Sequence, residues 1–188
     1  MRHTRLSTTA IATAAAIALA AGPAAAHTTQ PRTSSAAARL AREILNTKGI
    51  SYATAHVEHQ DAASLPRQNL LDTANGRPAK TSPWGHAHGA RVGLDPRMLN
   101  GVLKLRNQYH YTFTISEFVG GRHSPNSAHY KGRVVDVNYI NGKHVGKRTG
   151  APYRAFMAAC RNLGANLVLG PGDANHDTHV HCQWPTHH

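Results

Sequence analysis

The chain has few acidic residues and few aromatic residues. Of its 188 residues, 9 are Asp or Glu against 21 Lys or Arg, so the formal net charge at pH 7 is +12. A charge of this size favours binding to polyanions. However, aromatic residues make up only 6% of the chain, and the basic residues are scattered singly. The sequence therefore lacks the stacking platform and the basic stripe of a sequence-specific nucleic-acid binder.

Long apolar runs are absent except near the start. Residues 1–26 combine Arg2 and Arg5, an apolar run over residues 10–21 and a small-residue end at residues 24–26. This pattern predicts a secretory signal peptide, and the run is too short to span a bilayer comfortably. We expect a secreted mature chain over residues 27–188, without a membrane span and monomeric.

Removal of the leader would take away two arginines, so the mature charge would be +10 (12 − 2). Outside a bacterial cell the abundant polyanion is the cell wall with its acidic polymers. We therefore expect peptidoglycan and anionic cell-wall polymers as partners, and no specific nucleic acid. A solvated basic surface without a dedicated partner is the alternative interpretation.

Cysteine is also scarce, with Cys160 and Cys182 as the only two. In an exported chain such a pair can persist as a disulfide. The bridge would tie the strand that carries His181 to the helix that carries Cys160, whereas two separate buried thiols are the alternative.

The hydrophobic pattern predicts a single α+β domain, with a small antiparallel sheet flanked by helices. We expect an N-terminal helix and an irregular segment over residues 27–93, packed on a core over residues 94–188. Within the core we expect helices near residues 95–109 and 152–163. The expected strands lie near residues 111–119, 133–140, 166–169 and 179–184, with a hairpin turn at Asn141-Gly142.

Two short stretches carry the candidate metal ligands. The first, Ser127-Ala128-His129-Tyr130-Lys131-Gly132-Arg133-Val134-Val135-Asp136, places His129 seven residues before Asp136. The second, His176-Asp177-Thr178-His179-Val180-His181, lies near the C-terminus. Together His129, Asp136 and His181 offer two imidazoles and one carboxylate, a set that leaves the fourth position of a zinc ion open to water. Since the chain has fifteen histidines, ordinary hydrogen-bonded surface polarity is the alternative.

These residues resemble the superfamily of lysostaphin-type peptidoglycan endopeptidases, D-alanyl-D-alanine metallopeptidases and the hedgehog signalling domain. Its pattern is H-x6-D followed much later by H-x-H. The resemblance covers roughly residues 115–184 and implies Zn²⁺ bound by His129, Asp136 and His181. It also implies that Arg122, shortly before the S-x-H loop, stabilises the developing oxyanion.

The resemblance leaves the general base open. Many carboxypeptidases of the group carry an acidic residue three positions before the last ligand, where this chain has Thr178. The endopeptidase branch has histidines two and five positions before it, and His179 and His176 match. We therefore expect His179 as base or transition-state donor, with His176 in support and Asp177 as the alternative carboxylate.

A further carboxylate, Glu117, falls on the apolar face of the strand predicted near residues 111–119. A buried acid needs a partner, for which we expect Arg122 or a metal-bound histidine; an exposed position at a sheet edge is the alternative.

The expected function is that of a secreted zinc metallopeptidase, a hydrolase of D-alanine-containing peptide bonds in peptidoglycan, acting as a D,D-carboxypeptidase or a D,D-endopeptidase. Two alternatives remain open. One is a non-catalytic, metal-containing wall-binding module of the same fold, and the other is a zinc N-acetylmuramoyl-L-alanine amidase.

Overall fold

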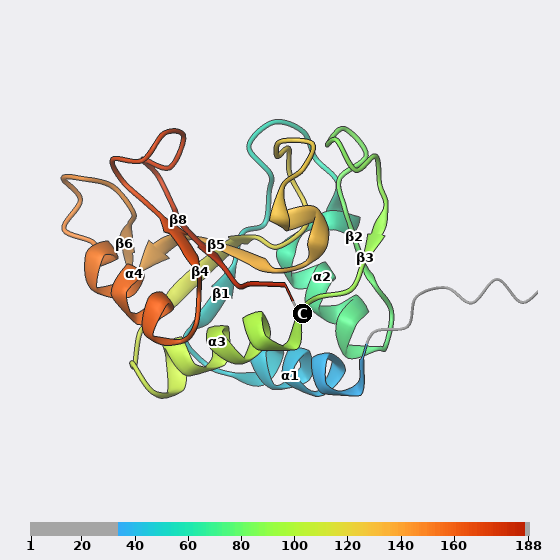
Figure 1. The fold of residues 1–188 in the computed structure, drawn as a ribbon, viewed down its shortest axis with the longest axis horizontal. Coiled ribbons are helices and arrows are strands. Elements are labelled where there is room, and N and C mark those ends of the chain that lie inside the picture. The colour runs from blue at the N-terminus through green and yellow to red at the C-terminus, as the bar shows by residue number, and fades with distance from the viewer. Residues whose placement is uncertain (1–33, 187–188) are drawn as a thin grey trace, which may run out of the picture.

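The computed structural model describes residues 34–186. The expected signal peptide lies outside the described residues, so the structure does not bear on it. Within them, four α-helices and a six-stranded sheet form one mixed α and β domain, with a short second sheet at one side (Figure 1). No helix in this part of the chain has the length and hydropathy needed to cross a bilayer.

The helices follow their expected starts and stops. The helix α1 (Ser35–Asn46) begins at Ser34, whose side chain accepts a hydrogen bond from Ala37 N, and α3 (Pro96–Asn107) is capped in the same way by Asp95. Both caps satisfy amide groups that a helix leaves unpaired at its start. The remaining helices are α2 (Pro66–Ala74) and α4 (Tyr153–Asn162).

The main sheet has the strand order β1-β4-β5-β8-β7, and β6 pairs with β5. Its strands are β1 (Ile50–Tyr52), β4 (Phe113–Glu117), β5 (Val134–Ile140), β6 (Lys143–His144), β7 (Leu167–Leu169) and β8 (Val180–Gln183). The expected hairpin is present, because Asn141 and Gly142 both adopt positive φ between β5 and β6, as a two-residue turn requires.

The predicted antiparallel sheet is present, but one pair of strands at its edge is parallel. The three-residue strand β1 runs parallel to β4. Parallel neighbours need a long crossover connection, and the chain between β1 and β4 supplies it through α2, α3 and the small sheet of β2 (Ala79–Lys80) and β3 (Arg91–Val92). Such a short, half-polar strand gives no periodic signal.

The core lies between the sheet and the helices. In Figure 1, α1 and α3 run beneath the sheet, whereas α2 with the small sheet and α4 with β6 rise on opposite sides. Buried apolar residues of α1, α3, α4 and the sheet form one continuous cluster. Strand β5 crosses its middle, with Val134, Val135 and Val137 fully buried. The central strand therefore holds Asp136 at a fixed place.

The expected disulfide is present and joins Cys160 of α4 to Cys182 of β8. Both residues are fully buried. Cys182 pairs with Val135 in the sheet, next to the pairing of His181 with Asp136. The bridge therefore fixes the strand that carries His181 against the helix layer.

Candidate metal centre

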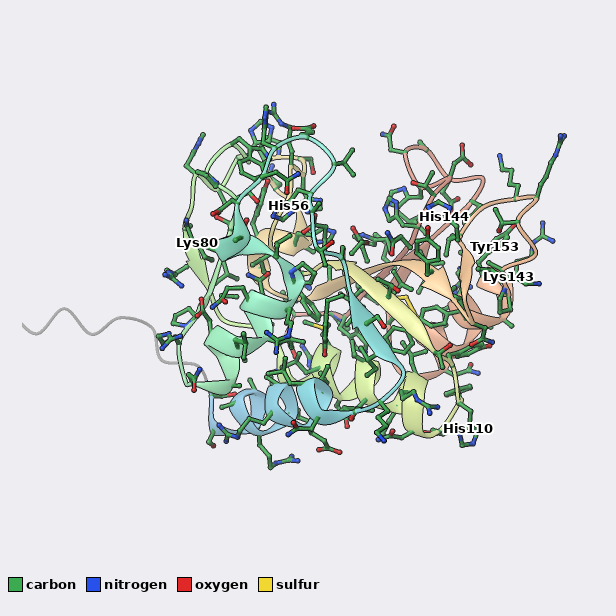
Figure 2. The ribbon with its side chains drawn as sticks, turned by 180° about the vertical axis from the view of Figure 1, so that it is seen from behind. His56, Lys80, His110, Lys143, His144 and Tyr153 are labelled. Atoms are coloured by element: carbon green, nitrogen blue, oxygen red, sulfur yellow. A yellow bond between two sulfur atoms is a disulfide. The ribbon has the colours of Figure 1, made fainter. Side chains whose placement is uncertain are left out.

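A cleft of about 810 Å³ opens between the two sides of the molecule, and the candidate residues lie in it. One wall comes from the loop after β1 and from residues 121–129, and the other comes from β6, β7 and residues 175–183. Figure 2 shows His56 and His144 on the two sides of this opening. Seven histidines line the cleft, namely His56, His123, His129, His144, His176, His179 and His181, so its chemistry is dominated by imidazole.

The S-x-H-x-x-G motif builds a single tight turn. His129 lies on the 3-10 helix η2 (Ala128–Lys131), and the Ser127 side chain accepts a hydrogen bond from the His129 amide. Gly132 ends the turn at φ 66°, where an added Cβ would lie 2.1 Å from the carbonyl oxygen of Gly93. Only glycine fits this close backbone approach. The motif therefore fixes the position of His129 just before β5 begins.

Two of the three predicted metal ligands, His129 and His181, contact the third, which is the Asp136 carboxylate. Asp136 Oδ2 lies 3.2 Å from His129 Nε2, and Asp136 Oδ1 lies 3.0 Å from His181 Nδ1. All three residues are buried. The antiparallel pairing of β5 and β8 sets Asp136 directly opposite His181, which explains how residues 45 positions apart in the sequence meet.

The protonation of His129 follows from its other nitrogen. His129 Nδ1–H donates a hydrogen bond of 2.6 Å to the carbonyl oxygen of Phe118, so Nε2 carries a lone pair unless the ring is charged. This lone pair faces a carboxylate oxygen, which only accepts. Positive charge is needed between the two atoms. Burial alone would lower the pKa of His129, but the Asp136 carboxylate overrides that effect and raises the pKa.

The same coupling acts on Asp136. Burial favours its neutral form, yet the neighbouring His129 and His181 hold the pKa of this carboxyl well below its usual range. The group is therefore an anion that must be neutralised by a cation, either a proton shared with an imidazole or a metal ion.

A fourth residue, His123, also belongs to this cluster, although no sequence motif selects it. The ligand atoms of His123, His129 and Asp136 lie within 4.8 Å of one another, so this group could hold a metal ion. The His123 ring stacks on that of His129, with centroids 3.5 Å apart and planes 8° apart. Burial and the neighbouring His129 lower the pKa of His123 to about 3, so the ring is neutral near pH 7. Motif spacing could not reveal it, because its place depends on a hydrogen bond from Nε2 to Gly120 O.

His179 and His176 line the cleft beside this cluster. His179 Nε2 lies 3.8 Å from Asp136 Oδ2, and its side chain is 22% exposed. Burial lowers the pKa of His179, against the opposing effect of the Asp136 carboxylate. The His176 ring contacts that of His179 at 4.9 Å between centroids. His176 Nδ1–H donates to the carbonyl oxygen of Ala174, which fixes the tilt of its ring.

Asp177 is turned away from the cleft. Its carboxylate accepts hydrogen bonds from Gly172 N at 3.0 Å and pairs with Lys147 at 3.3 Å, and it is not among the residues that line the cleft. These contacts lower the pKa of Asp177. The structure therefore does not bring this carboxylate to the other candidate residues.

Arg122 does line the cleft, and its partner is Glu58 at 2.9 Å. The expectation that Arg122 or a metal-bound histidine would pair with Glu117 is wrong. Glu117 instead accepts a hydrogen bond of 2.7 Å from His56 Nδ1. His56 comes from the loop after β1, a segment whose sequence gives no periodic signal.

The Glu117 and His56 pair begins a buried hydrogen-bonded chain. His56 Nε2 lies 3.0 Å from Ser64 Oγ, which lies 2.7 Å from Ser82 Oγ, and Ser82 Oγ accepts from the Gly121 amide at 2.9 Å. Burial raises the pKa of Glu117, against the effect of His56. The chain fixes the backbone that leads into Arg122 and His123.

Comparison with protein-family models, with curated proteins and with solved structures finds no match to this chain. The evidence for function is therefore the geometry of the cleft.

Proposed function

We propose that the chain is a secreted zinc metallopeptidase that hydrolyses D-alanine-containing peptide bonds of peptidoglycan, as a D,D-carboxypeptidase or a D,D-endopeptidase. The observation that carries the proposal is the meeting of His129, Asp136 and His181 at the floor of a large open cleft. Two imidazoles and one carboxylate are the ligand set of many catalytic zinc sites, in which one position stays open.

The residues present fit such an ion. A buried, anionic Asp136 faces the lone-pair nitrogen of His129, and a metal ion can replace the proton that would otherwise lie between them. The bond from His129 Nδ1–H to Phe118 O is the outer contact that orients a metal-binding histidine and fixes its tautomer.

His181 fits as the third ligand better than His123. A ligating nitrogen directs its lone pair in the plane of its ring, at about 2.0–2.1 Å from zinc. The rings of His123 and His129 are parallel and 3.5 Å apart, so they cannot both hold one ion in their planes. The rings of His129 and His181 meet at 64°, so their planes cross, and each ring has a nitrogen beside an oxygen of Asp136. We therefore assign His123 to support His129 by stacking.

When bound, zinc would lower the pKa of a water and polarise the scissile carbonyl. His179, kept neutral by burial, takes a proton from the attacking water. Arg122 carries a permanent charge that suits either the oxyanion or a carboxylate of the substrate, and the His176 ring supports His179 by contact with its ring. Asp177 has no role in this scheme, because its carboxylate is bound to Gly172 and Lys147.

Export is supported by the buried disulfide, which is typical of oxidising compartments. The strong positive charge supports attachment to anionic wall polymers.

The test combines zinc content with product analysis. We expect the purified protein to bind one zinc ion per chain and to release D-alanine or cleaved stem peptides from purified cell wall. We expect His181→Ala to lose both properties, because a two-ligand site does not retain zinc. The matched control is His86→Ala, since His86 is exposed and outside the cleft lining.

Two results would replace the proposal. One equivalent of zinc without hydrolysis would identify the non-catalytic wall-binding module. Release of an intact stem peptide, read from the product mass, would identify the amidase.

A further inference from the structure

The rim of the cleft holds an ion pair between Arg122 and Glu58. Arg122 lies in the loop between β4 and η2, and Glu58 lies in the loop after β1. Within the described residues, Arg122 is the only lysine or arginine that lines the cleft. The other acidic residues of the lining have partners inside the fold, since Glu117 is bound to His56 and Asp136 to the histidine cluster. The Arg122 and Glu58 pair is therefore the charged feature that faces an entering ligand.

Glu58 contacts only one edge of the guanidinium. Arg122 Nε donates to Glu58 Oε2 at 2.9 Å, and within residues 34–186 this is the polar contact that the side chain makes. Within the described residues, the N–H groups of the two terminal nitrogens of Arg122 therefore have no hydrogen-bond partner. A guanidinium end binds a carboxylate through two parallel hydrogen bonds, so this end of Arg122 is suited to an anionic group.

The backbone around Arg122 is held on both sides. The Gly121 amide donates to Ser82 Oγ at 2.9 Å, and the His123 amide donates to Tyr130 Oη at 3.0 Å. The side chain, by contrast, is 48% exposed, and an exposed arginine otherwise samples many rotamers. Contact with Glu58 restricts these rotamers, which lowers the entropy that a ligand must offset on binding.

Glu58 itself is not part of the packed core. Its side chain is 46% exposed, and the neighbouring Val57 is fully exposed at 102%. Packing therefore does not explain why Glu58 contacts Arg122. Arg122 and Glu58 line the same cleft as the candidate metal ligands, and His123, which follows Arg122, stacks on His129.

We propose that Glu58 is a positioning residue that holds Arg122 by Nε and presents its terminal nitrogens to a free carboxylate on the substrate. The ligand class is a peptide that ends in a carboxylate beside the scissile bond. This inference rests on the proposed function and deepens it, because such a subsite favours D,D-carboxypeptidase over D,D-endopeptidase action.

The experiment measures binding and needs no hydrolysis. N-acetyl-D-alanine and its carboxamide, which differ only in the carboxylate, are titrated into the zinc-loaded protein and followed by NMR. We expect the acid to bind about tenfold more tightly than the amide, as for a charge-assisted hydrogen-bonded pair. We expect Glu58→Gln to reduce this ratio several-fold, Glu58→Asp to give an intermediate ratio, and Arg122→Gln to bring it to about one.

The matched control is Glu43→Gln, which removes a similarly exposed carboxylate paired with Arg39 on α1 and should keep the wild-type ratio. Equal binding of acid and amide by the wild-type protein would overturn the carboxylate subsite. A Glu58→Gln ratio that is unchanged or larger would overturn the positioning role, the larger ratio meaning that Glu58 competes with the substrate. Hydrolysis measured separately shows whether the proposed function fails independently of the subsite.

Discussion

Single residues decide the charge state of the cleft floor. Asp136 is buried, yet it stays ionised because His129 and His181 hold its two oxygens. His129 is fixed by the Phe118 carbonyl, and His123 is fixed by Gly120 and by stacking on His129. His129 and His123 therefore each have one ring nitrogen bound to a backbone carbonyl, whereas His181 has one nitrogen bound to the Asp136 carboxylate.

The low pKa of His123 predicts a loss of stability in acid. Its pKa is about 3 in the folded protein against an ordinary value of 6.5, so below pH 6.5 the unfolded chain binds a proton that the folded protein does not. This contribution to stability is present above pH 6.5 and is lost as the pH falls toward 3, by at most about 1.4 kcal/mol per pH unit.

We therefore expect the free energy of unfolding of His123→Gln to depend less steeply on pH than that of the wild-type protein. The measurement is urea unfolding of the two metal-free proteins from pH 7 to pH 4. Asp136 contributes its own pH dependence to the stability of both proteins, so the comparison isolates the contribution of His123. Parallel curves for the two proteins would contradict the assignment to His123.

At the scale of elements, the site depends on how strands β5 and β8 pair and on how the helices hold them. The pairing places Asp136 opposite His181, and the disulfide ties β8 to α4. Trp184, which follows β8, is 2% exposed and packs against α3. Its indole N–H donates to Leu163 O at the end of α4. The end of the strand that carries His181 is therefore held by both helices.

Gly101 allows this contact. It lies inside α3, where an added Cβ would be 2.3 Å from Trp184 Cζ2. Alanine would gain about 1 kcal/mol of helix propensity over glycine, but overpacking against a buried tryptophan typically costs about 1–3 kcal/mol. The difference between these terms is a loss of about 0–2 kcal/mol, and an approach of 2.3 Å to a buried ring places the cost in the upper half of that range. We therefore expect Gly101→Ala to lower the free energy of unfolding by about 1–2 kcal/mol, measured by chemical denaturation.

The matched control is Gly93→Ala, because a Cβ at Gly93 would have no atom within 4 Å and should leave stability nearly unchanged. If Gly101→Ala were as stable as the wild-type protein, the close packing of Trp184 on α3 would not be the reason for a glycine at position 101.

At the scale of the whole molecule, a strongly basic protein carries a cleft lined by histidines. Its positive charge lies on scattered lysines and arginines, of which Arg122 alone reaches the cleft lining in the described part of the chain. The basic side chains are therefore separated from the candidate metal centre, since within the described residues all of them except Arg122 lie outside the cleft lining.

The net charge predicts salt-sensitive attachment to cell walls. We expect the protein to adsorb to insoluble walls at low ionic strength and to be released as salt rises, because the screening length falls from about 10 Å at 0.1 M to about 3 Å at 1 M. Sedimentation of wall-bound protein measures this. Walls stripped of anionic polymers serve as the control, and attachment that ignores both salt and stripping would exclude a charge-driven mechanism.

The sequence by itself determined the local elements and the identity of the central residues. Apolar periodicity predicted an N-terminal helix and helices near residues 95–109 and 152–163, where α1, α3 and α4 lie, because this signal depends on neighbours within a few positions. The motif spacing selected His129, Asp136 and His181, and the structure places one nitrogen of each histidine beside the Asp136 carboxylate. The pairing of Cys160 with Cys182 followed from their scarcity.

Only the tertiary structure decided which other residues join the cleft. His56, Glu58 and His123 come from irregular loops, where no period predicts the direction of a side chain. The tertiary structure also directs Asp177 away from the cleft and pairs Glu117 with His56 instead of Arg122. These contacts join segments up to 64 residues apart, and local sequence carries no information about them, since they depend on how the packed helices bring the loops together across the sheet.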